Sequence, residues 1–149
     1  MTSIKAILGL LLAAALAGAF ALASSARSTA PPRMGALHVT KECSQYFGHA
    51  GEFCTITSSN LSEIEPGMNV IYASAAGPRL LNSDLVLDGP GDDDAYGHVT
   101  LNFRTLSGVV TFLGGTGRFS GIYAHVAVTL DRETGLWHWD GMYRFVSHG

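Results

Sequence analysis

A glycine-rich string between two apolar runs places the strongest constraint on how this chain can fold. Residues 114–121 contain four glycines, and they separate residues 109–113 from residues 122–130. Both flanking runs are rich in β-branched and aromatic side chains, which suit a pleated, half-buried strand. The glycines supply the positive-φ and close-approach geometries that a connection between strands needs. The sequence therefore predicts two β-strands joined by a glycine-rich connection.

The same string does not fit the phosphate-binding loops of nucleotide-binding proteins. A Walker loop needs a lysine and a following helix, and a dinucleotide fingerprint also opens a helix, whereas a strand is expected here. The acidic residues 92–94 lack the spacing of an EF-hand, so a solvated turn is preferred over a calcium loop. We therefore expect no cofactor and no metal ion.

Alternating apolar and polar residues recur along the rest of the chain in short runs bounded by turn signals. No convincing long helix interrupts them. The expected strands cover residues 37–40, 52–57, 69–74, 84–88, 95–104, 109–113, 122–130 and 136–146. A turn is expected at Ser107 and Gly108, between the fifth and sixth of these runs. About eight short strands at regular spacing predict an all-β sandwich or barrel.

The N-terminal residues have the layout of a secretory signal peptide. Lys5 precedes an uninterrupted apolar run over residues 6–23, which ends in small residues. We predict a signal helix over residues 1–23, with cleavage as late as residue 26, and an uncleaved membrane anchor is the alternative. Residues 24–35 then form a flexible lead-in and residues 36–149 the barrel domain. The expected location is secreted or periplasmic, without stable membrane association after cleavage.

The cysteine count and the net charge argue against several kinds of site and partner. The chain contains two cysteines, Cys43 and Cys54. An even cysteine count in a secreted chain predicts one disulfide, and the spacing does not match a zinc site. A catalytic thiolate would require a free cysteine, which an oxidising compartment disfavours. The 149-residue chain has a net charge of −3 and no basic cluster, so nucleic acid is not an expected partner.

Several of these segments together resemble a known superfamily. The string Phe112-x-Gly114-Gly115-Thr116-Gly117-Arg118-Phe119 is similar to the glycine hairpin of the allene oxide cyclase and dirigent barrels. Bacterial secreted proteins of that superfamily are the nearer match. The shared segments cover residues 54–58, 86–88, 97–98 and 137–145.

This resemblance implies an eight-stranded antiparallel β-barrel of calycin type, which is often oligomeric in the plant members. Plant allene oxide cyclases isomerise an unstable fatty-acid epoxide in an apolar cavity, and dirigent proteins steer the coupling of phenoxy radicals. No catalytic residue of either family is carried over to this chain.

Two sets of side chains alternate on the last two predicted strands, and either set could line the barrel. The candidates for acid–base catalysis are His125, His138, Asp140 and Arg144. The candidates for ligand binding are Trp137, Trp139, Tyr143, Phe145 and Phe103. We expect the rings to point inward, because burying four large aromatic side chains outweighs leaving them in water.

Two functions from different classes are the main candidates, and a purely structural surface protein, which an exposed apolar patch would favour, is a third and lower option. The first is a secreted barrel that binds a small apolar ligand or associates with itself as a homo-oligomer. The second is an isomerase or cyclase that acts on a small hydrophobic substrate, in the manner of the allene oxide cyclases. An enzyme needs at least one ionisable group directed into the cavity, whereas a binding protein does not.

Overall fold

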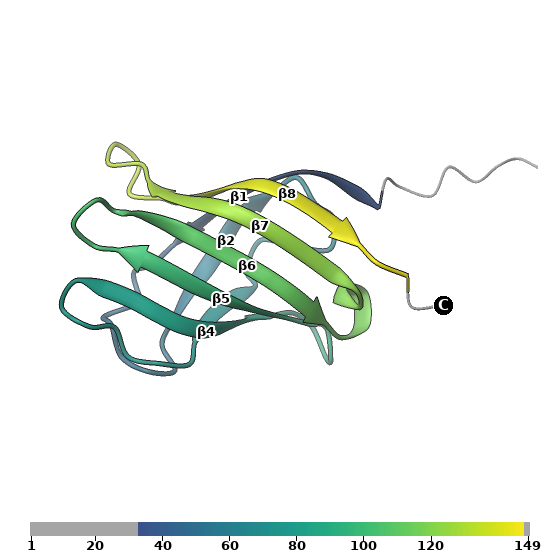
Figure 1. The fold of residues 1–149 in the computed structure, drawn as a ribbon, viewed down its shortest axis with the longest axis horizontal. Coiled ribbons are helices and arrows are strands. Elements are labelled where there is room, and N and C mark those ends of the chain that lie inside the picture. The colour runs from purple at the N-terminus through teal and green to yellow at the C-terminus, as the bar shows by residue number, and fades with distance from the viewer. Residues whose placement is uncertain (1–32, 148–149) are drawn as a thin grey trace, which may run out of the picture.

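The computed structural model describes residues 33–147 as a closed, all-β barrel of eight antiparallel strands (Figure 1). The strands are β1 (Met34–Glu42), β2 (Phe53–Ser59), β3 (Asn69–Tyr72), β4 (Leu80–Asp88), β5 (Asp94–Asn102), β6 (Ser107–Gly115), β7 (Ile122–Leu130) and β8 (Trp137–Phe145). A 3-10 turn, η1 (Gly117–Phe119), lies between β6 and β7. The predicted all-β barrel and its strand number are confirmed. The predicted signal helix lies outside the described residues.

Each strand pairs with the next one in the chain, and β8 pairs with β1 to close the barrel. That closing contact runs from Met34 opposite Arg144 to Lys41 opposite Trp137. β1 therefore begins two residues earlier than the predicted domain boundary at residue 36. Within residues 33–147, no helix is long and apolar enough to cross a membrane.

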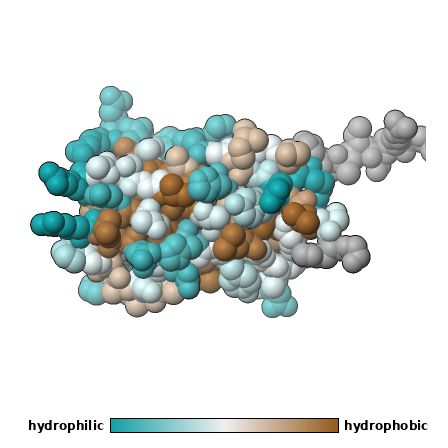
Figure 2. All heavy atoms as spheres, viewed as in Figure 1, coloured by the Kyte–Doolittle hydropathy of each residue, from teal (hydrophilic) through white to brown (hydrophobic). Residues whose placement is uncertain are grey.

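The connections between strands divide into two groups at opposite ends of the barrel. We call the end formed by residues 43–52, 73–79, 103–106 and 131–136 the open end, which lies at the left in Figure 1. We call the end formed by residues 60–68, 89–93 and 116–121 the closed end. Figure 2 shows hydrophilic side chains gathered over the turns of the open end.

Alternate side chains of each strand point into the barrel and form one core. On β8 the buried members are Trp139 and Phe145, while Asp140 and Arg144 are exposed. The ring of Trp139 packs edge-on against Phe112 of β6, with 5.6 Å between ring centroids. The structure therefore places the aromatic face of β8 inside, as the area argument predicted.

The glycine-rich connection is built around the closed end. Phe119 of η1 is fully buried there, together with Leu61, Ile64 and Met68 from the β2–β3 connection. Gly117 has a φ of 55°, and a Cβ at this position would collide with the carboxylate of Asp93. The glycine thus allows a tight turn that carries an aromatic ring into the end of the barrel.

Arg118 ties the same turn to its neighbours. Its Nε donates a hydrogen bond to Asp93 Oδ2 at 2.7 Å, and its backbone N–H donates to Asp93 Oδ1 at 3.0 Å. Its Nη1 lies 3.1 Å from Glu65 Oε1. These hydrogen bonds from Arg118 hold the pKa of Asp93 below its ordinary value. Three connections of the closed end are joined by one guanidinium group.

The turn expected at Ser107 and Gly108 is wrong, because both residues belong to β6. The chain reverses earlier, over residues 103–106, where Leu106 adopts a φ of 53°. A Cβ on Gly108 would collide with the backbone carbonyl of Thr100 on β5. This glycine therefore permits close strand packing, and it was mistaken for a turn signal.

Candidate functional site

The four polar candidates of β7 and β8 do not converge inside the barrel. His125, Asp140 and Arg144 are exposed on the outer face, and His138 is half-buried. Each contacts a different neighbour. His125 Nδ1 lies 3.1 Å from the Thr111 hydroxyl, and Asp140 Oδ1 lies 2.7 Å from His38 Nδ1. His138 Nε2 lies 4.0 Å from Asp131 Oδ2, and the Arg144 guanidinium lies 4.7 Å from the Tyr123 ring centroid. His125 and Arg144 border a groove of about 240 Å³ on the outer surface.

The aromatic candidates divide between the core and a pocket. Trp139 and Phe145 are buried in the core, and Trp137 and Tyr143 are partly buried against it. Phe103 is the one aromatic candidate that lines the pocket at the open end. It reaches the pocket from the β5–β6 turn, although the sequence placed it at the end of a strand.

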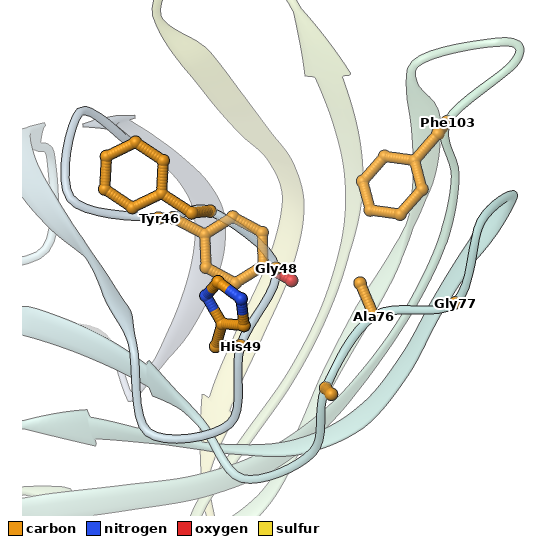
Figure 3. Close-up of a pocket in the computed structure, with 8 residues that line it drawn as sticks. Tyr46, Gly48, His49, Ala76, Gly77 and Phe103 are labelled. Atoms are coloured by element: carbon orange, nitrogen blue, oxygen red, sulfur yellow. The ribbon is translucent and has the colours of Figure 1, made fainter.

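The pocket at the open end has a volume of about 590 Å³ and is lined by Tyr46, Phe47, Gly48, His49, Ala75, Ala76, Gly77 and Phe103. Figure 3 shows Tyr46 and His49 on one side of the pocket, with Ala76 and Phe103 across from them. The lining combines aromatic rings and small apolar groups with one imidazole. Drug-sized ligands occupy pockets of this size and composition.

The β1–β2 connection, which forms one wall of the pocket, is held at both ends. The predicted disulfide between Cys43 and Cys54 is confirmed, with 4.3 Å between their Cα atoms. Inside the loop, Glu52 accepts hydrogen bonds from the backbone N–H groups of Phe47 at 2.7 Å and His49 at 2.9 Å. These bonds, that of His49 foremost, lower the pKa of Glu52.

The two walls of the pocket are also joined to each other. The backbone N–H of Ala76 donates a hydrogen bond to the Gly48 carbonyl at 2.9 Å. This bond links the β3–β4 connection to the β1–β2 connection. The pocket is therefore a preformed feature of the open end, which lowers the entropic cost of filling it.

A buried lysine lies behind the Tyr46 wall of the pocket, and the sequence analysis missed it. Tyr46 packs against Tyr72 of β3, with 4.8 Å between ring centroids. The Tyr72 hydroxyl accepts a hydrogen bond from Lys41 Nζ, and the Lys41 side chain is only 5% exposed. Burial lowers the pKa of Lys41 to about 7 and raises that of Tyr72 above its ordinary value.

Alternation along β1 explains how Lys41 enters the barrel. Leu37, Val39 and Lys41 are every second residue of the strand, and all three are buried. The pairing of β1 with β2 shifts register between Thr40 and Lys41, next to this site. The predicted strand ended at Thr40. Lys41 was therefore left out of the alternation that places Leu37 and Val39 inside the barrel.

Among residues 33–147 there is no group of three or more histidine, cysteine, aspartate or glutamate side chains placed to hold a metal ion. Asp93, within the acidic run, instead binds Arg118. Comparisons of the chain with protein-family models, with curated proteins and with solved structures found no match.

Proposed function

We propose that this protein is a secreted or periplasmic β-barrel that binds a small, mostly apolar molecule in the pocket at its open end. The observation that carries the proposal is this pocket of about 590 Å³, which Tyr46, Phe47 and Phe103 line with aromatic rings. The hollow at the closed end is smaller, at about 350 Å³, and has no aromatic side chain in its lining. Aromatic rings on two walls would provide most of the binding free energy, through their large contact area. His49 would contribute a polar contact that orients the ligand.

The location in this proposal is supported by the disulfide. Such bonds form and persist in oxidising compartments, and both cysteines of the chain are used in one bridge. No helix within the described range is long and apolar enough to cross a membrane. An extracellular or periplasmic location is consistent with the disulfide.

The superfamily resemblance forms part of this proposal. A closed eight-stranded antiparallel barrel is the fold that the allene oxide cyclase and dirigent resemblance implies. Three candidates for acid–base catalysis, His125, Asp140 and Arg144, lie on the outer face, which favours ligand binding. Isomerisation is the second candidate function, because His49 is an ionisable group in the pocket lining. Self-association stays a prediction, which native mass spectrometry of the purified protein would check.

The binding proposal is tested with the uncharged dye N-phenyl-1-naphthylamine, which becomes fluorescent when it leaves water. We expect saturable binding by the wild-type protein and a dissociation constant about tenfold higher for Phe103→Ser, which removes one aromatic wall. Leu113→Ser is the matched control, because Leu113 is an exposed apolar residue of β6 outside the open-end pocket.

Absence of dye binding by the wild-type protein would refute the proposal. So would weaker binding in Leu113→Ser together with unchanged binding in Phe103→Ser, since the dye would then occupy the outer surface. Near-ultraviolet circular dichroism of each variant establishes that the barrel is intact.

A further inference from the structure

The chain uses lysine in an unusual way. It contains two lysines, Lys5 and Lys41, and Lys5 lies in the predicted signal segment. Every other basic residue in the barrel apart from histidine is arginine, at positions 33, 79, 104, 118, 132 and 144. The one lysine of the barrel is thus also its buried cationic side chain. Among the arginines, even Arg118 of the closed end keeps part of its side chain exposed.

Lys41 has no carboxylate partner in the part of the chain that the structure describes. None of the ion pairs found within residues 33–147 includes it, and its one close polar neighbour is the Tyr72 hydroxyl. The disulfide is near, with Cys43 Sγ at 4.0 Å from Nζ. Burial of an unpaired ammonium group is costly, so this environment favours the neutral amine. Among the residues that the structure describes, Tyr72 is the sole titratable side chain in hydrogen-bond contact with Lys41.

Three aromatic rings surround the amine. Nζ lies 5.2 Å from the ring centroid of Tyr72, 5.4 Å from that of Trp139 and 6.0 Å from that of Trp137. Such rings favour the ammonium form and so oppose the effect of burial, but they leave the lone pair of the neutral amine free. The site is therefore apolar, aromatic and equipped with one nitrogen nucleophile.

Two buried polar groups around this site have no partner in the described protein. Trp139 Nε1 is a buried donor without an acceptor, and the Tyr46 hydroxyl is buried without a hydrogen bond. Buried donors are nearly always satisfied, so a ligand that offers an acceptor oxygen would complement them. Tyr46 lines the pocket and packs on Tyr72, whose hydroxyl contacts Lys41. The contacts that connect the pocket to the amine therefore run through two aromatic rings.

We propose that Lys41 is a nucleophile that captures an aldehyde or ketone from the open-end pocket as a covalent imine. This inference rests on the proposed binding function and names the ligand class as a carbonyl compound with an apolar body. Lysine is the side chain suited to this step, because an arginine guanidinium stays protonated in proteins and offers no free amine.

The chemical step balances without any further reagent. The Nζ lone pair adds to the carbonyl carbon, and one amine proton moves to the oxygen to give a carbinolamine. The second amine proton leaves with the hydroxyl group as water, and a C=N bond replaces the C=O bond. The Tyr72 hydroxyl, already in contact with Nζ, is placed to pass these protons from nitrogen to oxygen.

The test uses protein purified after secretory expression of the full chain and the aldehyde 2-naphthaldehyde. Sodium cyanoborohydride reduces any imine to a stable amine, and peptide mapping by mass spectrometry then locates the added mass. We expect Lys41 to be the principal site, with a rate at pH 7 at least about tenfold that of N-acetyl-lysine. The rate should rise with pH and level off above about pH 8, because the pKa of Lys41 is about 7.

Three variants distinguish formation of the imine at Lys41 from binding of the dye in the pocket. Lys41→Met should lose the labelling and retain binding of N-phenyl-1-naphthylamine. Tyr46→Ala should be labelled severalfold faster, because it removes the outer of the two rings between the pocket and the amine. Tyr72→Phe should be labelled more slowly and retain dye binding, as expected for a residue that relays protons.

The possible failures are distinguishable. Absence of label at Lys41 in both the wild-type protein and Tyr46→Ala, with dye binding retained, would overturn the imine and leave the proposed binding function standing. Labelling at Lys41 with the slow rate and high pKa of an ordinary amine would also overturn it. Absence of both labelling and dye binding in a folded wild-type protein would refute the proposed binding function as well.

Discussion

The two ends of the barrel are built from the same kind of short connection and differ in what fills them. The closed end packs four buried apolar side chains beneath a hollow of about 350 Å³, and Arg118 links its turns through Asp93 and Glu65. The open end leaves a pocket of about 590 Å³ and buries an amine below it. The first arrangement buries apolar side chains, and the second leaves space between its connections. At the open end, the Cys43–Cys54 disulfide and the hydrogen bonds to Glu52 offset the cost of burying the amine.

The largest expected effect tests the packing of the closed end. Phe119→Ala removes a fully buried ring and should lower the free energy of unfolding by about 3 to 5 kcal/mol, measured by chemical denaturation. Phe47→Ala is the matched control at the open end, where the side chain is 74% exposed, and we expect a change below about 0.5 kcal/mol. Equal losses in the two variants would show that the ends do not differ in packing.

The next effect concerns the covalent restraint of the open end. Replacing both cysteines, Cys43→Ser with Cys54→Ser, should lower the free energy of unfolding by about 3 kcal/mol, because the unfolded chain gains freedom. Dye binding should weaken in the same variant, since the bridge holds the loop that carries Tyr46 and His49. A destabilised variant with unchanged dye affinity would show that the hydrogen bonds to Glu52 hold the pocket wall without the bridge.

A third prediction measures the cost of burying Lys41. Its pKa is about 7 in the folded protein, against an ordinary value of 10.5. Between these pH values the unfolded chain binds more protons than the folded one, so stability should rise with pH. From pH 7 to about pH 8.5 the gain should be about 2 kcal/mol relative to Lys41→Met, which lacks the titration. Parallel pH profiles for the two proteins would contradict a buried neutral amine.

The smallest effect probes the ion pairs of the closed end. Arg118→Gln should lower the melting temperature slightly at low salt, and the difference from the wild-type protein should shrink in concentrated sodium chloride, which screens exposed charges. Arg132→Gln, in the exposed β7–β8 turn, is the matched control. A lower melting temperature that persists at high salt would show that Arg118 stabilises the turn through its hydrogen bonds and not through its charge.

The sequence was sufficient for the features that local patterns encode. Strand periodicity and turn residues predicted the all-β class, and the glycine string correctly marked the connection between β6 and β7. The bridge between Cys43 and Cys54 followed from cysteine number and compartment. The inward face of β8 followed from the area of its rings, because that term is large enough to decide between two alternating sets.

The site was harder to predict because it depends on contacts between distant segments. The pocket walls come from three connections that meet only when the barrel closes, and no local pattern joins Tyr46 to Ala76 and Phe103. Phe103 was selected as a ring on a strand and reaches the pocket from a turn. Lys41 was passed over because a charged residue normally ends a buried strand, and here tertiary packing outweighed that preference.

The places where the chain enters and leaves the barrel have a practical consequence. Arg33 and Val146 both lie at the closed end, where the Arg33 carbonyl accepts a hydrogen bond from Phe145 N–H at 2.6 Å and the Gly121 carbonyl accepts one from Val146 N–H at 2.8 Å. A linker joined next to Arg33 or next to Val146 would therefore leave the pocket at the open end unobstructed. Immobilised on a sensor surface through such a linker, every molecule would present its pocket to the solution in the same orientation.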